Sequence, residues 1–259
     1  MYLTRRVLSA FAVSAALALG ACGGGADQPS AGQTQYERSS DRGLGSADAP
    51  LTMIEYASVA CSHCAEFHEE VWSSLRSDYI DTGKVRYVFR EMITGPRPLA
   101  IAGFAMAHCV APERYFDTLD VLFRQQRAIF QAAQAPGGPR SQYVAIARSM
   151  GMNEAEFDAC LNNQEVTNAI VASNDRALSE GIDSTPRFMF NGELLEGRRA
   201  PGASEYTYFL GGSQVMIDGA PVLAIPDEET FRRLIDHLLA QISGEASPAA
   251  EAAPATEEE

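Results

Sequence analysis

The sequence predicts a mixed α/β fold in which a block of helices separates two groups of strands. Three observations support this: short apolar runs typical of strands lie on either side of the middle, helical apolar spacing fills the middle, and an amphipathic helix closes the folded region. The expected element order is β-α-β, then helices, then β-β-α. We expect one composite folded region over residues 48–244, with the helical insertion at about 96–181.

The first unit is a predicted strand, helix and strand. Leu51–Tyr56 is a short apolar run and predicts a buried strand. Cys61–Ile80 carries apolar side chains on one face and predicts an amphipathic helix that Gly83 ends. Val85–Phe89 predicts the second strand. The tetrapeptide Cys61-Ser62-His63-Cys64 therefore stands where the first strand meets the helix.

The middle of the chain has helical spacing with clear breaks. Proline favours the first turn of a helix, so Pro112 is a predicted helix start. Asn153 and Glu156 have the spacing of a capping box. The predicted helices are Pro98–Cys109, one from Pro112 to the break at 136–139, Ser141–Met150, one beginning near Asn153, and about Gln164–Glu180.

Strand character returns after the helices. Arg187–Phe190 predicts a strand, and Asn191-Gly192 is a strong hairpin turn signal before the return strand Glu193–Glu196. Residues 197–226 are rich in glycine and proline, and Val215–Ile217 fits either a second hairpin or an extension of the sheet. Asp227–Ser243 predicts the last helix.

Composition excludes several classes of function. The 259 residues are 46% hydrophobic and 21% charged, which is a globular composition. The net charge is −14 and Lys84 is the only lysine. A nucleic-acid site needs clustered positive charge to neutralise phosphates, so this chain is a poor candidate for one.

The two ends are predicted to lie outside the fold. Residues 1–21 combine a basic pair with an apolar run too short to span a membrane, and predict an export signal peptide. Leu19-Gly20-Ala21-Cys22 resembles a bacterial lipobox, which implies a lipid on Cys22; an ordinary secretory signal with a chance cysteine is the alternative. Residues 22–47 predict a flexible tether, and residues 245–259 a disordered acidic tail.

Export has consequences for location and for the cysteines. We expect a periplasm-facing, lipid-anchored protein of the bacterial envelope, and Gly23 after the lipobox favours the outer membrane by resemblance. Disulfides persist in that compartment. Without Cys22 four cysteines remain, which allow two bridges in three possible pairings: Cys61, Cys64, Cys109 and Cys160.

The Cys61-Ser62-His63-Cys64 motif predicts a redox site. Unpaired amides and the dipole at a helix N-terminus favour an anion, so Cys61 is the expected nucleophilic thiolate. Cys64 lies further into the helix and is expected to resolve mixed disulfides, while His63 adds a positive or hydrogen-bonding group. Stabilising the thiolate makes the disulfide a better oxidant of other thiols.

A CxxC motif can also serve in a metal site or as a structural disulfide. A zinc site needs two further ligands at suitable spacing, and the sequence has no second CxxC or HxxxH. A copper carrier would need a Met/His cluster, which is also lacking. A static structural disulfide stays open as an alternative.

Three segments together resemble the DsbA-like thiol:disulfide oxidoreductases of the thioredoxin superfamily: 49–56, Cys61-Ser62-His63-Cys64, and Thr185-Pro186 with the strand that follows. The resemblance implies a thioredoxin-like fold with an inserted helical domain. It also implies that Pro186 is a cis-proline, and that Thr185 beside it pairs with a substrate segment as an added strand.

The resemblance assigns further roles. Glu55 is implied to be the family's buried acid, able to relay a proton to or from Cys64; an edge or solvated glutamate is the alternative. Cys109 and Cys160 are implied to form a structural disulfide in the insertion. His68 is expected to be a surface residue rather than a catalytic one.

The expected function is oxidation of reduced or unfolded exported proteins by the Cys61–Cys64 disulfide, without metal, nucleotide or other cofactor. The resemblance implies reoxidation by a quinone-linked membrane partner of the DsbB type. A reductase or isomerase on the same scaffold is one rival, and a noncatalytic thioredoxin-like chaperone or binding module is another. Residues 23–47 lack an apolar stripe, which favours a monomer over an oligomeric isomerase.

Overall fold

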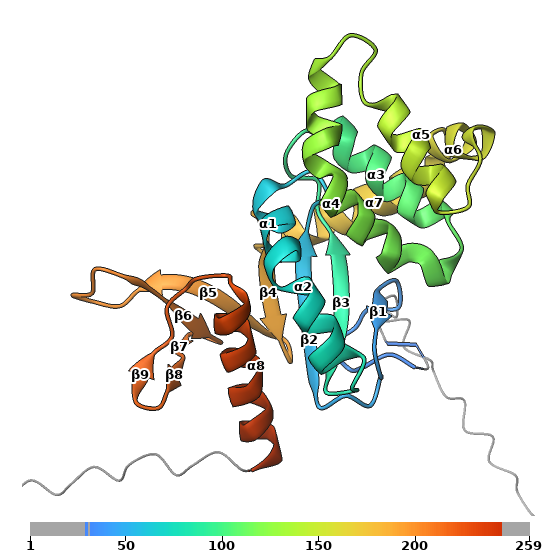
Figure 1. The fold of residues 1–259 in the computed structure, drawn as a ribbon. Coiled ribbons are helices and arrows are strands. Elements are labelled where there is room, and N and C mark those ends of the chain that lie inside the picture. The colour runs from blue at the N-terminus through green and yellow to red at the C-terminus, as the bar shows by residue number, and fades with distance from the viewer. Residues whose placement is uncertain (1–28, 31, 245–259) are drawn as a thin grey trace, which may run out of the picture.

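The computed structural model describes residues 29–30 and 32–244, and a seven-stranded mixed sheet runs through this part of the chain (Figure 1). The strand order is β1-β3-β2-β4-β5-β6-β7, with β2 and β3 parallel and the other pairs antiparallel. The predicted elements occur in the predicted order, with one additional strand before them and further strands between the predicted hairpin and the last helix. The strands of the sheet are β1 (Arg42–Leu44), β2 (Leu51–Ala57), β3 (Val85–Glu91), β4 (Arg187–Phe190), β5 (Glu193–Arg199), β6 (Tyr206–Leu210) and β7 (Ser213–Gln214).

The two central strands β2 and β3 are buried along their whole length. Because helices cover both faces of a parallel pair, such strands need apolar side chains on both sides. One face belongs to the large core that also contains Phe67, Phe104 and Phe231. The other face carries Ile54 and Val88 in a smaller core.

The helix after β2 is interrupted rather than continuous. Helix α1 (Ser62–Glu70) ends at Val71, and α2 (Trp72–Ser74) leads into a π-helical stretch, Leu75–Ile80. Gly83 then adopts a left-handed conformation with φ of 74°, as expected for the end of this segment. The break leaves Val71, Trp72 and Leu75 buried against the sheet.

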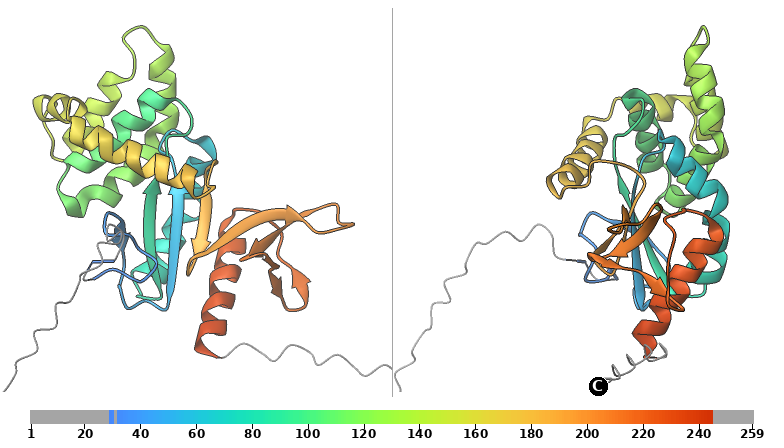
Figure 2. Two further views of the ribbon diagram at one scale, coloured as in Figure 1. Left: turned by 180° about the vertical axis from the view of Figure 1, so that it is seen from behind. Right: turned by 90° about the vertical axis from the view of Figure 1, so that its left-hand side faces the viewer.

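The helical insertion lies over one end of the sheet (Figures 1 and 2). Helix α4 packs against α1, and α7 contacts β3. The capping box at Asn153 and Glu156 is present, with both reciprocal hydrogen bonds. The insertion comprises α3 (Arg97–Cys109), the 3-10 turn Pro112–Arg114, α4 (Tyr115–Gln134), α5 (Arg140–Ser149), α6 (Glu154–Leu161) and α7 (Gln164–Ser179).

The prediction of a flexible tether over residues 22–47 is wrong for its second half. Strand β1 pairs antiparallel with β3 at the edge of the sheet. Ahead of it, Glu37 is buried and binds Arg86 through two contacts of 2.9 and 3.1 Å. Asp41 binds Arg90 at 2.7 Å. Buried ion pairs rather than an apolar stripe hold this segment, so hydrophobic patterning did not predict it.

The segment after β4 extends the sheet away from the core. Asn191 and Gly192 both have positive φ, 47° and 84°, and close the predicted β4–β5 hairpin. Strands β5 and β6 then reach outward beside α8 (Glu228–Ser243) (Figures 1 and 2). Of the two structures expected at Val215–Ile217, the hairpin is present rather than an extension of the sheet. Strand β8 (Met216–Ile217) pairs with β9 (Ala220–Pro221) in a separate two-stranded sheet.

Several expectations concern parts of the chain outside the described residues: the signal peptide at 1–21, the lipid on Cys22, Gly23, and the tail at 245–259. Among residues 29–30 and 32–244, no helix combines the length and apolar character that a membrane span requires.

Candidate active site

The loop after β2 delivers Cys61 to the start of α1. Cys61 is the N-cap residue, with extended backbone angles, and its amide donates to the Ser58 carbonyl at 3.0 Å. Gln126 of α4 is buried and donates to the carbonyls of Val59 at 2.9 Å and Cys61 at 3.0 Å. The helical insertion therefore fixes the backbone of the loop that presents the cysteine.

The two cysteines of the motif have opposite environments. Both are unpaired thiols, with Cys61 half-buried and Cys64 fully buried. The pKa of Cys61 is lowered to about 5, chiefly by a hydrogen bond from the Cys64 thiol, with burial opposing and the Thr185 side chain adding to the lowering. Burial raises the pKa of Cys64 well above its ordinary value, and the Cys61 sulfur adds to that rise. At neutral pH Cys61 is a thiolate and Cys64 a thiol.

The cause of the low Cys61 pKa differs from the sequence argument. From the sequence, the amides and the dipole at the start of the helix are expected to be the main cause of the lowered pKa. The amides of Cys64 and His63 do lower the pKa, but they contribute less than the Cys64 thiol. The Cys61 sulfur is thus held as an anion mainly by its partner cysteine, Cys64.

Thr185 and Pro186 lie beside Cys61 although more than a hundred residues separate them in sequence. The Thr185–Pro186 bond is cis. The Cys61 sulfur lies 3.5 Å from the Thr185 carbonyl oxygen and donates to it when protonated, and the Thr185 hydroxyl forms a 2.5 Å hydrogen bond with the hydroxyl of Thr94. Thr94 lies in the loop after β3, so this hydrogen bond connects that loop to the Thr185-Pro186 loop before β4.

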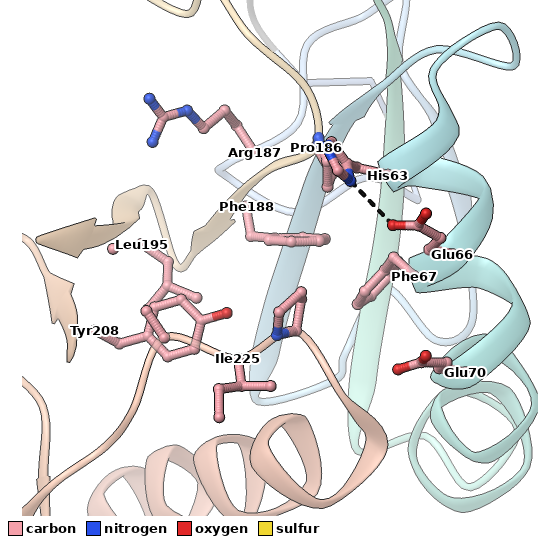
Figure 3. Close-up of a pocket in the computed structure, with 13 residues that line it drawn as sticks. His63, Glu66, Phe67, Glu70, Pro186, Arg187, Phe188, Leu195, Tyr208 and Ile225 are labelled. Carbon is pink, nitrogen blue, oxygen red and sulfur yellow. Dashed lines mark hydrogen bonds and ion pairs between the residues drawn. The ribbon is translucent and has the colours of Figure 1, made fainter. Parts of the chain in front are cut away.

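The His63 side chain contacts Glu66 of its own helix. Its side chain is 79% exposed, and Nδ1 lies 2.9 Å from Glu66 Oε2 (Figure 3). Glu66 raises the pKa of His63, and the Cys61 anion adds a smaller contribution in the same direction. The His63 backbone amide also lowers the pKa of Cys61 by a hydrogen bond.

Glu55 is completely buried beneath the cysteines, on β2. Its Oε2 accepts a hydrogen bond from the Tyr87 hydroxyl at 2.5 Å and lies 3.2 Å from His68 Nε2. Its charge contributes to the raised pKa of Cys64. The alternative of a solvated edge glutamate is therefore wrong. The expectation of a surface His68 is also wrong, because the side chain is only 4% exposed.

A groove of about 490 Å³ opens beside Pro186 (Figure 3). Helix α1 forms one wall and the strands β4 to β6 the other. Its aromatic floor joins Phe67 to Phe188, whose ring centroids are 4.6 Å apart. The lining residues are His63, Glu66, Phe67, Glu70, Pro186, Arg187, Phe188, Leu195, Gly197, Tyr208, Ala224, Ile225 and Pro226.

The other two cysteines are joined in the helical insertion. Cys109 at the end of α3 and Cys160 in α6 form a disulfide, with Cα atoms 6.1 Å apart. The bond closes a sequence separation of 51 residues. It links two helices and lines none of the groove beside Pro186.

Several residues of the site were missed from the sequence. Tyr87 and His68 hold Glu55, Thr94 binds Thr185, and Gln126 fixes the loop before Cys61. Gln126 leaves a signal, because a polar residue interrupts the apolar stripe of its helix. The others have partners on distant elements, and local spacing carries no sign of them.

Comparison with known proteins agrees with this geometry. The family model described as thioredoxin matches residues 37–205, more than half of the chain. A Rickettsia conorii protein with the provisional name protein-disulfide oxidoreductase is 30% identical over 155 residues, which are 59% of this chain and 53% of that protein. Disulfide bond formation protein D of Bacillus subtilis is 27% identical over 157 residues, 59% of this chain and 68% of that protein. The chain spans about half the length of the Rickettsia relatives it matches.

Solved structures share the fold. Alpha-DsbA1 of Wolbachia pipientis has a TM-score of 0.60 at 24% identity, covering 80% of this chain and 95% of that one. Oxidised BdbD of Bacillus subtilis has a TM-score of 0.55 at 16% identity, covering 77% and 92%. A redox-type CxxC at a helix start, a cis-proline facing it, a helical insertion and these matches converge on one assignment. The chain belongs to the thioredoxin family.

Proposed function

We propose that this protein catalyses thiol–disulfide exchange and introduces disulfide bonds into exported proteins. The observation that carries the proposal is the opposite ionisation of the two cysteines in one motif. The pKa of Cys61 is about 5, while burial raises that of Cys64 well above its ordinary value. A half-buried thiolate beside a buried thiol is the arrangement that divides the work between an attacking or leaving sulfur and a resolving sulfur.

The reaction begins from the Cys61–Cys64 disulfide. A substrate thiolate attacks Cys61 Sγ, the Cys61–Cys64 bond breaks, and Cys64 leaves as a thiolate that takes up a proton. A second substrate thiolate then attacks the substrate sulfur of the mixed disulfide, and Cys61 leaves as its stable thiolate. The substrate is oxidised by two electrons and gains a disulfide, while the enzyme is reduced by two.

The low pKa of Cys61 favours this direction. A sulfur that is stable as an anion is a good leaving group, and stabilisation of the reduced enzyme makes its disulfide oxidising. Glu55 is the proposed proton carrier for Cys64, because it is the carboxylate buried beneath that thiol and its charge acts on the thiol's pKa.

The substrate is proposed to bind as an extended segment. The Thr185 backbone faces Cys61, so a chain that pairs with Thr185 would bring its own cysteine to the sulfur. The groove beside Pro186 would take neighbouring side chains on its aromatic floor. The name of the Bacillus subtilis relative, disulfide bond formation protein D, supports a protein substrate.

The cellular setting of the proposal comes from the sequence. The predicted export signal and the lipobox-like residues 19–22 support the proposal of a lipid on Cys22 and of a periplasm-facing domain in the envelope, with the outer membrane favoured. The working unit is a monomer that uses only its redox-active disulfide and no added cofactor. Reoxidation falls to a quinone-linked membrane oxidase of the DsbB type.

The test is oxidation of a reduced dithiol peptide by stoichiometric oxidised protein. We expect one peptide disulfide per protein, and Cys61→Ala should reduce the rate to that of peptide alone. The reduction potential of the Cys61–Cys64 pair, measured against glutathione, separates the rivals. A strongly negative potential with no peptide oxidation would replace the oxidase by a reductase or a static structural bridge, and light scattering that shows a dimer would favour an isomerase.

A further inference from the structure

The two oxygens of the buried Glu55 carboxylate have different surroundings. Oε2 receives the Tyr87 hydroxyl at 2.5 Å and faces His68 Nε2 at 3.2 Å. Oε1 has no hydrogen-bond partner among the residues that the structure describes. Burying a polar atom without a partner is unfavourable, so an orientation that leaves one oxygen open needs another reason.

The His68 ring is held in place by aromatic neighbours. It stacks on Phe123 of α4 with centroids 3.9 Å apart and an angle of 18° between the planes. Trp72 lies 5.1 Å away on another side. With Nε2–H donating to Glu55, the unpartnered Nδ1 is a bare acceptor, the tautomer that leaves no buried N–H unpaired.

We propose that His68 is a positioning residue for proton exchange between Cys64 and Glu55, an inference that rests on the proposed function. His68 and Tyr87 both engage Oε2, which turns Oε1 into the oxygen free to exchange a proton. His68 lies one helical turn after Cys64, so both side chains project from the same face of α1 toward β2.

The step can be written with full balance. When the Cys64 sulfur attacks the mixed disulfide at Cys61, the proton of the Cys64 thiol moves to Glu55 Oε1. The Cys61–Cys64 bond forms as the bond between Cys61 and the substrate sulfur breaks, and the substrate sulfur leaves as a thiolate. In the opposite direction Cys64 leaves as a thiolate and takes the proton back from Oε1. No additional oxidant or reductant takes part.

The titratable groups around this pair are few in the described part of the chain. Helix α1 contributes Cys64 and His68, and β3 contributes Tyr87. Tyr115 of α4 raises the pKa of Tyr87 by a coulombic interaction. Burial holds the pKa values of Cys64, Tyr87 and Tyr115 well above their ordinary range. These three groups therefore keep one protonation state between pH 5 and 8 and do not shape a pH profile of the Cys64 step in that window.

Two amide variants form a matched test. In His68→Gln the amide nitrogen falls near the position of Nε2, whereas in His68→Asn it falls near Nδ1 and cannot reach Glu55. Stopped-flow measurement should follow release of a peptide from its mixed disulfide with Cys61, from pH 5 to 8. We expect His68→Asn to slow release about tenfold, less than the roughly 10²–10⁴ typical of a general acid or base, because Glu55 itself is retained. Its pH profile should match that of Glu55→Gln, while His68→Gln should keep the wild-type profile.

The result has a clear opposite. If the two amide variants release the peptide with the same rate and pH profile, or if His68→Asn slows release equally in the Glu55→Gln background, His68 does not act through Glu55. His68→Phe, which keeps an aromatic ring against Phe123, takes the place of Asn if that variant does not fold. The attack of a substrate thiolate on the Cys61–Cys64 disulfide is the reverse of this step, so it should slow in the same variants. Its complete absence in wild-type protein would reject the proposed function instead.

Discussion

The molecule contains two cysteine pairs that differ in almost every physical respect. Cys61 and Cys64 are separated by one helical turn, and their pKa values move in opposite directions. Cys109 and Cys160 close a separation of 51 residues between two helices of the insertion. The comparison shows that reactivity comes from the electrostatics around a sulfur, whereas the loop that a bond closes determines what it contributes to stability.

The strongest challenge to this comparison is removal of the resolving sulfur. Cys64→Ala leaves the Cys61 thiolate able to attack a disulfide but removes the intramolecular exit, so mixed disulfides formed by attack on an oxidised peptide or on oxidised glutathione, with release of the other thiolate, should accumulate. Mass spectrometry should show one adduct per protein, where wild type shows almost none. Wild-type-like release in this variant would mean that Cys64 is not the resolving sulfur. Because the Cys64 thiol is the main cause of the low Cys61 pKa, that pKa should also rise in Cys64→Ala.

Removal of the second pair should produce the reverse pattern. In Cys109→Ala/Cys160→Ala the unfolded chain regains the freedom of a loop of 51 residues. In the chain-entropy model this lowers the free energy of unfolding by about 4 kcal/mol. Urea denaturation measures this loss of unfolding free energy. At a temperature where the variant stays folded, the rate of peptide oxidation should be unchanged within about twofold, because the bond lies outside the groove beside Pro186. A large fall in rate with unchanged stability would contradict the division of roles.

The pH dependence of stability should differ between the two redox forms. In the reduced protein the pKa of Cys61 is about 5 when folded against an ordinary value of 9.0, so between these values the unfolded chain binds one more proton. Stability from this group is complete above pH 9 and is lost as the pH falls toward 5. The unfolding free energy of reduced minus oxidised protein should therefore increase from pH 5 to 9. Reduced Cys61→Ala serves as the control, and an equally large increase there would show that another group is responsible.

The parts of the fold that the sequence predicted are those with local causes. Strand β2 and helix α1 follow from apolar periodicity, and the β4–β5 hairpin from Asn191-Gly192, whose positive φ values require such residues. Strand β1 was missed because charge holds it. Glu37 and Asp41 are polar residues in a glycine-rich segment, and only their burial against Arg86 and Arg90 explains the order.

The site divides in the same way. Cys61, Cys64 and the Thr185-Pro186 pair follow from motif and resemblance, and the structure brings them together. His68 was misplaced because its environment depends on Phe123, which lies 55 positions away on α4, and on Glu55 of β2. The Cys64 contribution to the Cys61 pKa depends on side-chain geometry that spacing alone does not give.

A smaller effect should follow from the loop opposite Cys61. The Thr185 side chain lowers the pKa of Cys61, less than the Cys64 thiol does. Thr185→Val keeps the shape and the backbone carbonyl but removes the hydroxyl, so the pKa of Cys61 should rise from about 5 while the thiolate still dominates at pH 7. Thiolate absorbance at 240 nm, titrated in reduced protein, measures this. Thr94→Val removes only the hydroxyl partner of Thr185 and should shift the pKa less.

The smallest expected effect concerns His63, whose exposed side chain should have little influence on the Cys61 pKa. Glu66 is the first cause of the raised His63 pKa, so Glu66→Gln should return that pKa toward its ordinary value. The imidazole hydrogen-bonds Glu66, and its coulombic interaction with Cys61 is the smallest of the causes that act on the His63 pKa, so the Cys61 titration should hardly move (Figure 3). NMR of the His63 ring protons and absorbance at 240 nm follow the two groups in one sample. A large rise in the Cys61 pKa would return the histidine side chain to the role that the motif first suggested, and would make the reactive pair depend on its surface as well as on its buried partner.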